Sequence, residues 1–199
     1  MQYRKVTTPP AVEPITITEF KAQTRVVRSD EDTLINRLIT SARLKVEDEQ
    51  WRKLITTSVE VRFDRFPSQT SANPLGTIAL PYPPLQSVTS VKYIDTDGVE
   101  QTLVEGTDYR VIAPGPDALG RVEVEYQKTW PETRVETDAV RIEFVCGYGA
   151  QVDVPESTKT AVLLWAAEMY MHREASELPP SRRVAEWIDQ DSFRGFASV

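Results

Sequence analysis

The sequence has very few of the residues on which most catalytic and metal sites depend. Its 199 residues include one cysteine, Cys146, and one histidine, His172. A single cysteine cannot form an intrachain disulfide, and a zinc site needs several Cys or His ligands at short spacings. The patterns G-x-S-x-G, G-x-x-x-x-G-K-[ST] and H-E-x-x-H are absent. We therefore expect no catalytic residues, no metal, no cofactor and no enzymatic activity.

An excess of positive charge and a long apolar run are missing as well. Lys and Arg total 23 against 30 Asp and Glu, which gives a net charge of −7. Tight binding to nucleic acid needs clustered positive charge, so we expect none here. The apolar run at residues 161–171 is too short for a membrane span of about 20 residues. The opening residues, MQYRKVTTPP, lack the apolar core of a signal peptide.

Helical patterns occupy the first third of the chain. Thr16 and Glu19 stand at capping-box spacing, which predicts a short helix from Ile17. Ser29 and Asp32 repeat that spacing and predict the start of a second helix. Behind them, apolar residues recur at steps of three and four, which is typical of an amphipathic helix of about five turns. These residues are Leu34, Ile35, Leu38, Ile39, Ala42 and Val46.

The middle of the chain changes to the two-residue period of β-strands. Val59, Val61 and Phe63 alternate with polar residues, which predicts a strand with one buried face. The turn sequence at residues 95–98, DTDG, predicts a hairpin. We expect an antiparallel sheet or sandwich. The predicted strand segments are 56–63, 87–103 (two strands), 108–112, 121–126 and 139–146.

A second helical pattern follows Gly147-Tyr148-Gly149, with Pro155 at an early helical position and an end near Glu174. The fold class is therefore α+β. We expect a small helical bundle, made of two N-terminal helices and a C-terminal helix, with an inserted antiparallel β region and extended N- and C-terminal arms. The expected divisions are an N-terminal arm (1–13), a helical part (14–56), the β region (57–146), the C-terminal helix (147–178) and a docking tail (179–199).

Two local patterns resemble functional sites but have simpler interpretations. His172 and Glu174 suggest a metal or acid–base pair, yet residues two apart on a helix point to different sides. A histidine at the negative end of a helix dipole is the simpler reading. The VCGYG stretch is similar to a potassium-channel filter, which would need flanking membrane helices. We interpret it as a glycine-permitted turn with Tyr148 packed on the core.

The helix after Pro155 is apolar on every side over residues 161–171. A helix at the edge of a monomer would carry a polar stripe, so this one is predicted to be buried all round. The residues that bury this helix belong either to the rest of its own chain or to a neighbouring subunit. The residues that would form such a subunit interface are Leu163, Leu164, Trp165, Met169 and Tyr170.

The segment after Pro179 and Pro180 carries aromatic residues but is too short to build a core of its own. Aromatic anchors on a short arm are typical of a peptide that docks into a partner's groove. Folding back onto the parent chain is the alternative. The candidate docking residues are Arg182, Arg183, Trp187, Ile188, Phe193 and Phe196.

The order of the sequence blocks resembles one known family. The blocks are PITITEFKAQTRV, SDEDTLINRLITSARLKVE, LITTSVEVRFDRFP, LPYPPLQSVTSVKYIDTDGVEQTL, DYRV, WPETR and AVRIEFVCGYGAQVDVPESTKTAVLLWAAEMYMHREA. Together they are similar to the head–tail connector (adaptor) proteins of tailed bacteriophages, which have relatives in prophages and gene transfer agents. The similarity extends from about Pro14 to Ala175 and depends on two blocks in combination, PLxSV–YxDxDGxxQTL and F-x-x-GYG–P–helix–RE.

This resemblance implies a structural virion protein of the neck, assembled in the host cytoplasm. It implies a homo-oligomeric ring, usually of twelve copies, beneath the portal protein and above the next neck or tail protein (stopper). DNA would pass through the lumen without specific binding, and no membrane is involved. The helices would form the ring body, the β region would face the neighbouring ring or tail, and the C-terminal segment would reach toward the portal.

Three other functions stay open at this point. One is a different neck or tail-completion subunit, such as a stopper or tail terminator. Another is a hydrolytic enzyme that uses acidic residues near His172. A third is a carbohydrate- or receptor-binding β module, which would need exposed aromatic residues within 57–146. The alternating pattern instead predicts that most aromatic residues there are buried.

Overall fold

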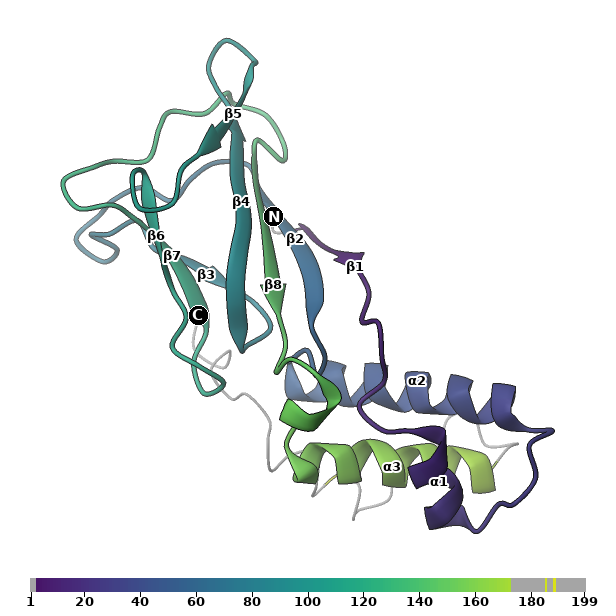
Figure 1. Ribbon diagram of the computed structural model, residues 1–199. Coiled ribbons are helices and arrows are strands. Elements are labelled where there is room, and N and C mark those ends of the chain that lie inside the picture. Colours follow the sequence, from purple (N-terminus) through teal and green to yellow (C-terminus); the bar gives the residue numbers. More distant parts are fainter. Residues whose placement is uncertain (1–2, 173–184, 186–187, 189–199) are drawn as a thin grey trace. The chain divides into compact units, whose positions relative to one another are not determined.

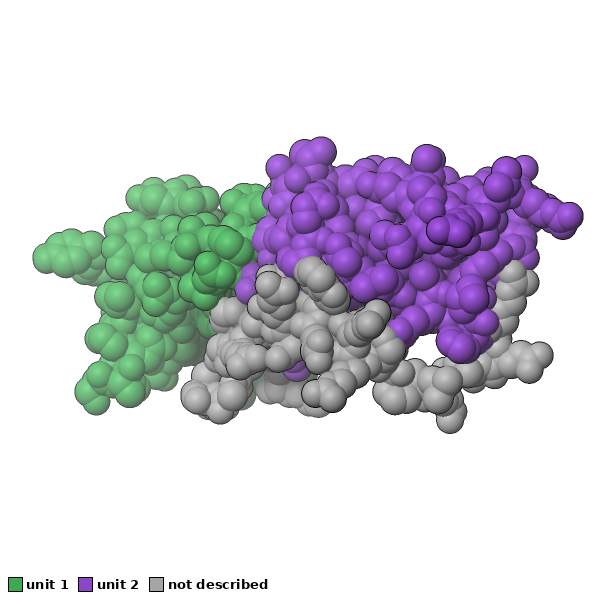
Figure 2. Space-filling model, turned by 90° about the horizontal axis from the view of Figure 1, so that it is seen from below, with its two compact units in different colours: residues 1–9, 56–147 green, residues 10–55, 148–199 purple. Residues whose placement is uncertain are grey.

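The structure is a computed structural model whose described part comprises residues 3–172, Ala185 and Ile188 (Figure 1). It confirms the α+β class, with three helices packed together and two antiparallel sheets. The chain divides into two compact units, which are coloured separately in Figure 2. Residues 10–55 and 148–199 form the helical unit, and residues 1–9 and 56–147 form the β unit.

Helix α1 (Ile17–Thr24) begins where its capping box predicts. The Glu19 backbone N–H donates to Thr16 Oγ1 at 3.1 Å, and the Thr16 N–H donates to Glu19 Oε2 at 2.6 Å. These two bonds satisfy backbone donors that a helix start otherwise leaves unpaired. The helix ends at Arg25, whose backbone adopts the left-handed conformation with φ of 56°.

Helix α2 (Asp32–Gln50) starts later than the sequence predicts. The expected cap at Ser29 is wrong, because Glu31 is the N-cap residue and makes no side-chain cap bond. The nearby acidic side chains bind other helices instead. Lys21 Nζ of α1 forms a 2.5 Å ion pair with Asp32 Oδ1, and the Tyr170 hydroxyl donates to the Glu31 carboxylate. Tertiary contacts therefore compete with local capping here.

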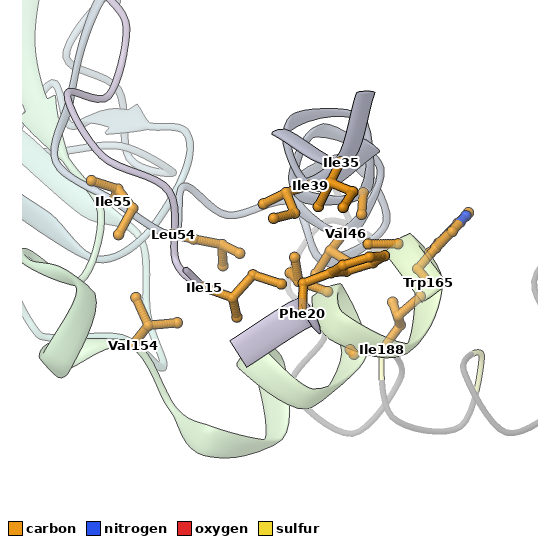
Figure 3. Close-up of a cluster of buried hydrophobic side chains, with 14 residues drawn as sticks. Ile15, Phe20, Ile35, Ile39, Val46, Leu54, Ile55, Val154, Trp165 and Ile188 are labelled. Carbon is orange, nitrogen blue, oxygen red and sulfur yellow. The ribbon is translucent and has the colours of Figure 1, made fainter. Parts of the chain in front are cut away.

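Helix α3 (Glu156–Met171) follows a short 3-10 helix (Gln151–Asp153) and packs against both α1 and α2. Four residues of the predicted apolar period of α2, Ile35, Ile39, Ala42 and Val46, lie in this core, and Figure 3 shows side chains that meet there. The other two, Leu34 and Leu38, are half-buried and lie outside it. The helical core includes Ile15, Phe20, Ile35, Ile39, Ala42, Val46, Leu54, Ile55, Val154, Ala161, Val162, Trp165, Ala166 and Ile188.

The β unit contains a five-stranded and a three-stranded sheet around one core. Of the two expected arrangements, an antiparallel sheet or a sandwich, the structure has two antiparallel sheets that share a core. Every pairing between named strands is antiparallel. The larger sheet has the order β1 (Tyr3–Thr8), β2 (Thr57–Phe63), β8 (Val140–Cys146), β4 (Leu85–Ile94) and β5 (Glu100–Leu103). The smaller sheet has the order β3 (Ile78–Leu80), β7 (Gly120–Val124) and β6 (Tyr109–Ile112).

The buried faces follow the alternation read from the sequence. On β8, Val140, Ile142, Phe144 and Cys146 are all fully buried. The sequence pattern did not show β1, which lies within the segment described as an extended arm, or β3, which is only three residues long. At Gly120 of β7 the two sheets approach closely, because a Cβ atom there would collide with the Leu85 side chain of β4. The glycine thus allows the close packing.

Candidate interaction surfaces

The described residues contain no cluster suited to holding a metal ion. Across residues 3–172, no group of three or more His, Cys, Asp or Glu side chains could hold a metal ion. His172 is exposed and caps the C-terminal end of α3, where its backbone N–H donates to the Glu168 carbonyl at 2.9 Å. Cys146 is fully buried, with Sγ 3.6 Å from the Thr57 carbonyl oxygen. Glu174, the suggested partner of His172, lies outside the described residues.

No helix in this same part of the chain is long and apolar enough to cross a bilayer. The Gly-Tyr-Gly stretch forms the predicted turn, since Gly147 and Gly149 have φ of 111° and 132°. A Cβ atom at Gly149 would lie 2.6 Å from Asp153 Oδ2, which itself accepts a 2.8 Å bond from the Ala150 N–H. Tyr148 packs against the helical core. The turn therefore requires glycine for its backbone and for space.

The face of α3 that the sequence marks as a subunit interface is partly covered by the chain's own helices. Trp165 is buried, with 8% of its surface exposed. Leu163, Leu164, Met169 and Tyr170 are half-buried and pack against the same core. The Tyr170 ring meets the Phe20 ring edge-on, with centroids 5.6 Å apart and planes at 81°. Self-burial thus accounts for part of the apolar character of α3.

One residue of the predicted docking tail is tied to the helical unit. Ile188 is 5% exposed within the helical core (Figure 3), and its carbonyl accepts a 3.1 Å hydrogen bond from Gln50 Nε2 at the end of α2. At this position the chain folds back onto itself. The other tail residues proposed for docking lie outside the described residues: Arg182, Arg183, Trp187, Phe193 and Phe196.

A buried ionic cluster joins α2 to the segments before and after it. Glu47 is 1% exposed, and its carboxylate binds Arg43 Nη1 at 3.2 Å, Lys53 Nζ at 2.7 Å and the Leu54 N–H at 3.2 Å. Arg43 Nε also binds Glu13 Oε2 at 2.7 Å. Burial by itself lowers the pKa of Arg43, but the charges of Glu47 and Glu13 outweigh it and raise that pKa above its ordinary value.

Sequence reasoning missed this cluster. The only local signal is the four-residue spacing of Arg43 and Glu47, which is also common on exposed helix faces. The partners Glu13 and Lys53 lie on irregular segments, so no period places them near α2. The cluster holds the segment before α1, through Glu13, and the segment after α2, through Lys53, against helix α2.

The β unit carries an open groove between two irregular loops. It has a volume of about 1000 Å³ and is lined by residues 64–69 and 129–137. Phe66 and Trp130 stack in it, with ring centroids 4.6 Å apart and planes at 2°. Trp130 Nε1 donates to the Gly76 carbonyl at 2.7 Å, which ties this lining segment to the loop before β3. Tyr126 is 79% exposed, an exception to the expectation of buried aromatic residues in this region.

No protein-family model and no curated protein matches the sequence. The fold, in contrast, matches a chain in the structure of the virion of a native gene transfer agent (GTA) particle. That match covers 96% of this chain and 95% of the other, with a TM-score of 0.77 and 20% sequence identity. The chain has the fold of a GTA particle protein.

Two further matches come from reconstructions of the particle neck. One chain belongs to the neck of an empty GTA particle computed with C6 symmetry, with a TM-score of 0.74 and 21% identity. The other belongs to the neck of a native GTA particle computed with C12 symmetry, with a TM-score of 0.69 and 21% identity. Each match covers 97% of this chain and 95% of its counterpart. The matches therefore extend over both the helical unit and the β unit of this chain.

Proposed function

We propose that this protein is a structural subunit of the neck of a gene transfer agent or tailed-phage particle, acting as a head–tail adaptor. The observation that carries the proposal is the fold match over 96–97% of the chain to proteins of GTA particles, two of them in neck structures. The head–tail connector resemblance of the sequence blocks agrees with it. In this role the protein joins the portal to the next neck or tail protein and has no chemistry of its own.

We propose a closed ring of twelve copies. A matched chain lies in a neck reconstruction computed with C12 symmetry and another in one computed with C6 symmetry. A ring of twelve copies is compatible with both reconstructions, because a twelvefold axis contains a sixfold axis. A ring of six copies is compatible only with the C6 reconstruction. One repeated heterologous contact is enough to close such a ring. The half-buried α3 residues Leu163, Leu164, Met169 and Tyr170 are proposed to contribute to this contact.

The ring is proposed to conduct DNA without binding it. Each copy carries a net charge of −7, so the assembled ring is strongly acidic. Duplex DNA carries one negative charge per about 1.7 Å, and an acidic wall repels it. A filter-binding assay at low and high salt tests this part. We expect no duplex binding at either salt concentration, and tight, salt-sensitive binding by the isolated protein would contradict it.

The C-terminal tail is proposed to dock on the portal. Ile188 is buried in the helical core, so it serves as the fixed point of the tail. The contact with the portal is assigned to Arg182, Arg183, Trp187, Phe193 and Phe196. A large aromatic anchor at such an interface contributes about 2 kcal/mol or more, and a ring multiplies the effect.

Two deletions test the docking role with purified portal rings. Removing residues 189–199 leaves Ile188 in place, so the protein should stay folded and yet co-sediment less with portal rings. Removing residues 181–199 also takes away the buried Ile188. Full-strength co-sedimentation of either deletion would overturn the docking role. The His172→Ala variant serves as the control, since an adaptor without chemistry should assemble into particles at the same titre.

A second candidate is a different neck subunit, a stopper, which the match to the C6 reconstruction also allows. The number of copies in an imaged particle separates the two. Twelve copies directly below the portal support the adaptor, and six copies one layer further down support the stopper. The location of this chain outside the neck would overturn both.

A further inference from the structure

The larger sheet ends in two edge strands, β1 and β5, which lie on opposite sides of β2, β8 and β4 (Figure 1). Within the described part of the chain, no strand pairs with the outer side of either one. An edge strand presents backbone N–H and C=O groups that can pair with a strand of another chain. Both edges belong to one continuous sheet within the β unit, so the sheet fixes the position and direction of β1 relative to β5.

Each edge also exposes apolar side chains. On β1, Tyr3 is 50% exposed and Val6 is 43% exposed. Next to the two ends of β5, Val99 is 54% exposed and Val104 is 57% exposed. β-Branched and aromatic residues stabilise a sheet mainly through contacts with cross-strand neighbours. A further strand beside each edge would supply those neighbours.

The two edges carry opposite charges. Residues 3–8 contain Arg4 and Lys5 and no acidic residue. Residues 95–108, which include β5 and its flanking turns, contain no lysine or arginine. Opposite charges at the two edges favour pairing of unlike edges over pairing of like edges. The acidic residues of this segment are Asp95, Asp97, Glu100, Glu105 and Asp108. Glu100 forms ion pairs with Lys92 and Arg141, and Asp108 forms one with Lys128, so the excess negative charge of this edge comes from Asp95, Asp97 and Glu105.

Strand direction decides how unlike edges would meet. Because the five strands alternate in direction, β1 and β5 run the same way. In a closed ring of many copies each subunit is turned only slightly relative to the next. The β5 strand of one copy and the β1 strand of the next would therefore be parallel. Pairing of like edges about a twofold axis would instead be antiparallel and would stop at a dimer.

We propose that the β5 edge of each subunit pairs in parallel with the β1 edge of the next copy. The β sheets then run continuously round the ring. This inference rests on the ring proposed above and names its contact within the β unit. The surface is heterologous, with a basic edge on one copy and an acidic edge on the next, which is the kind of contact that a ring repeats at every subunit.

Chemical cross-linking of the full-length protein tests the contact directly. Thr7 and Thr102 are exposed on β1 and β5, and the native Cys146 is fully buried and shielded from reagents. The double variant Thr7→Cys/Thr102→Cys, treated with a short bismaleimide at high protein concentration, should give a ladder of covalent oligomers up to the ring. An equal mixture of the two single variants should stop at dimers, and each single variant alone should stay uncross-linked.

The outcomes separate this contact from the ring itself. Dimers of Thr7→Cys alone would show pairing of like edges and would overturn the inference. Closed rings seen by electron microscopy without cross-links in the double variant would overturn the sheet contact and leave the ring intact. The absence of rings both in solution and in imaged particles would overturn both proposals.

A charge exchange provides the second test. Lys5→Glu and Glu105→Lys should each reduce the assembled fraction several-fold, and their combination should restore it toward the wild-type value. Arg121→Glu is the matched control, because Arg121 is exposed on β7 of the other sheet. Screening predicts that the wild-type contact weakens at high salt. Equal losses in Lys5→Glu and Arg121→Glu, or no loss in either charge variant, would contradict the inference.

Discussion

Gln50 Nε2 donates a 3.1 Å hydrogen bond to the backbone carbonyl of Ile188, across 138 positions of sequence. Gln50 is fully buried, and Ile188 is 5% exposed in the helical core. The sequence left open whether the C-terminal tail folds onto its own chain or extends to a partner. At Ile188 it folds back, which makes this residue an internal anchor.

We expect Ile188→Ala to destabilise the helical unit by about 2 kcal/mol, because the substitution leaves a cavity in a packed core. Denaturant unfolding followed by circular dichroism measures the change. The matched control is Ala185→Ser, one turn earlier and exposed, which should shift the unfolding free energy by less than about 0.5 kcal/mol. Equal stability of Ile188→Ala and wild type would show that the anchor contributes nothing.

Glu47→Gln should destabilise the helical unit by about 3 kcal/mol. The substitution removes the buried negative charge that Arg43 and Lys53 share, and breaking a buried ion pair from one side leaves uncompensated charge. Urea unfolding measures the difference. Glu49→Gln, on the exposed side of the same helix, is the control and should lie within about 0.5 kcal/mol of wild type. Similar values for the two variants would mean that solvent already screens the cluster.

Gly120→Ala should destabilise the β unit by about 1–3 kcal/mol, because the new methyl group would collide with Leu85 of the facing sheet. Thermal unfolding of the purified variant measures the change. Ala79→Val adds bulk to the neighbouring strand β3 at an exposed position and should be nearly neutral. A neutral Gly120→Ala variant would show that the two sheets can move apart at no cost.

The capping box of α1 predicts a pH dependence. Hydrogen bonds from the Thr16 N–H and hydroxyl lower the pKa of Glu19 below its ordinary 4.5. A carboxylate whose pKa is lowered by folding stabilises the protein above its unfolded pKa and loses that effect as the pH falls through the folded pKa.

At pH 7, Glu19→Gln should therefore be less stable than wild type, by about 0.5 kcal/mol because the side chain is exposed. The difference should shrink as the pH falls below 4.5 and vanish once the wild-type carboxyl is protonated. Unfolding free energies of both proteins between pH 7 and pH 3 measure it. A difference that stays constant over this range would exclude the carboxylate as the cause.

The secondary structure could be predicted wherever one face of an element is buried. The alternation on β8 and the three- and four-residue steps on α2 both gave correct elements, because burial imposes its period on the sequence. Strands β1 and β3 were missed because neither shows a clear period. The side chains of β1 are mostly exposed, and β3 is too short to show a period. The start of α2 was predicted wrongly because Tyr170 and Lys21 bind the acidic residues there.

By itself the sequence determined the α+β class, the apolar faces of helices and strands, and the absence of the usual catalytic motifs. These features follow from local periods and residue types, which a single chain displays directly. Only the tertiary structure decided that Ile188 is buried, that Glu47 forms ion pairs with Arg43 and Lys53, and that β1 and β5 lie at opposite edges of one sheet. Each of these depends on bringing together residues far apart in the chain, and no local pattern records which distant segments become neighbours.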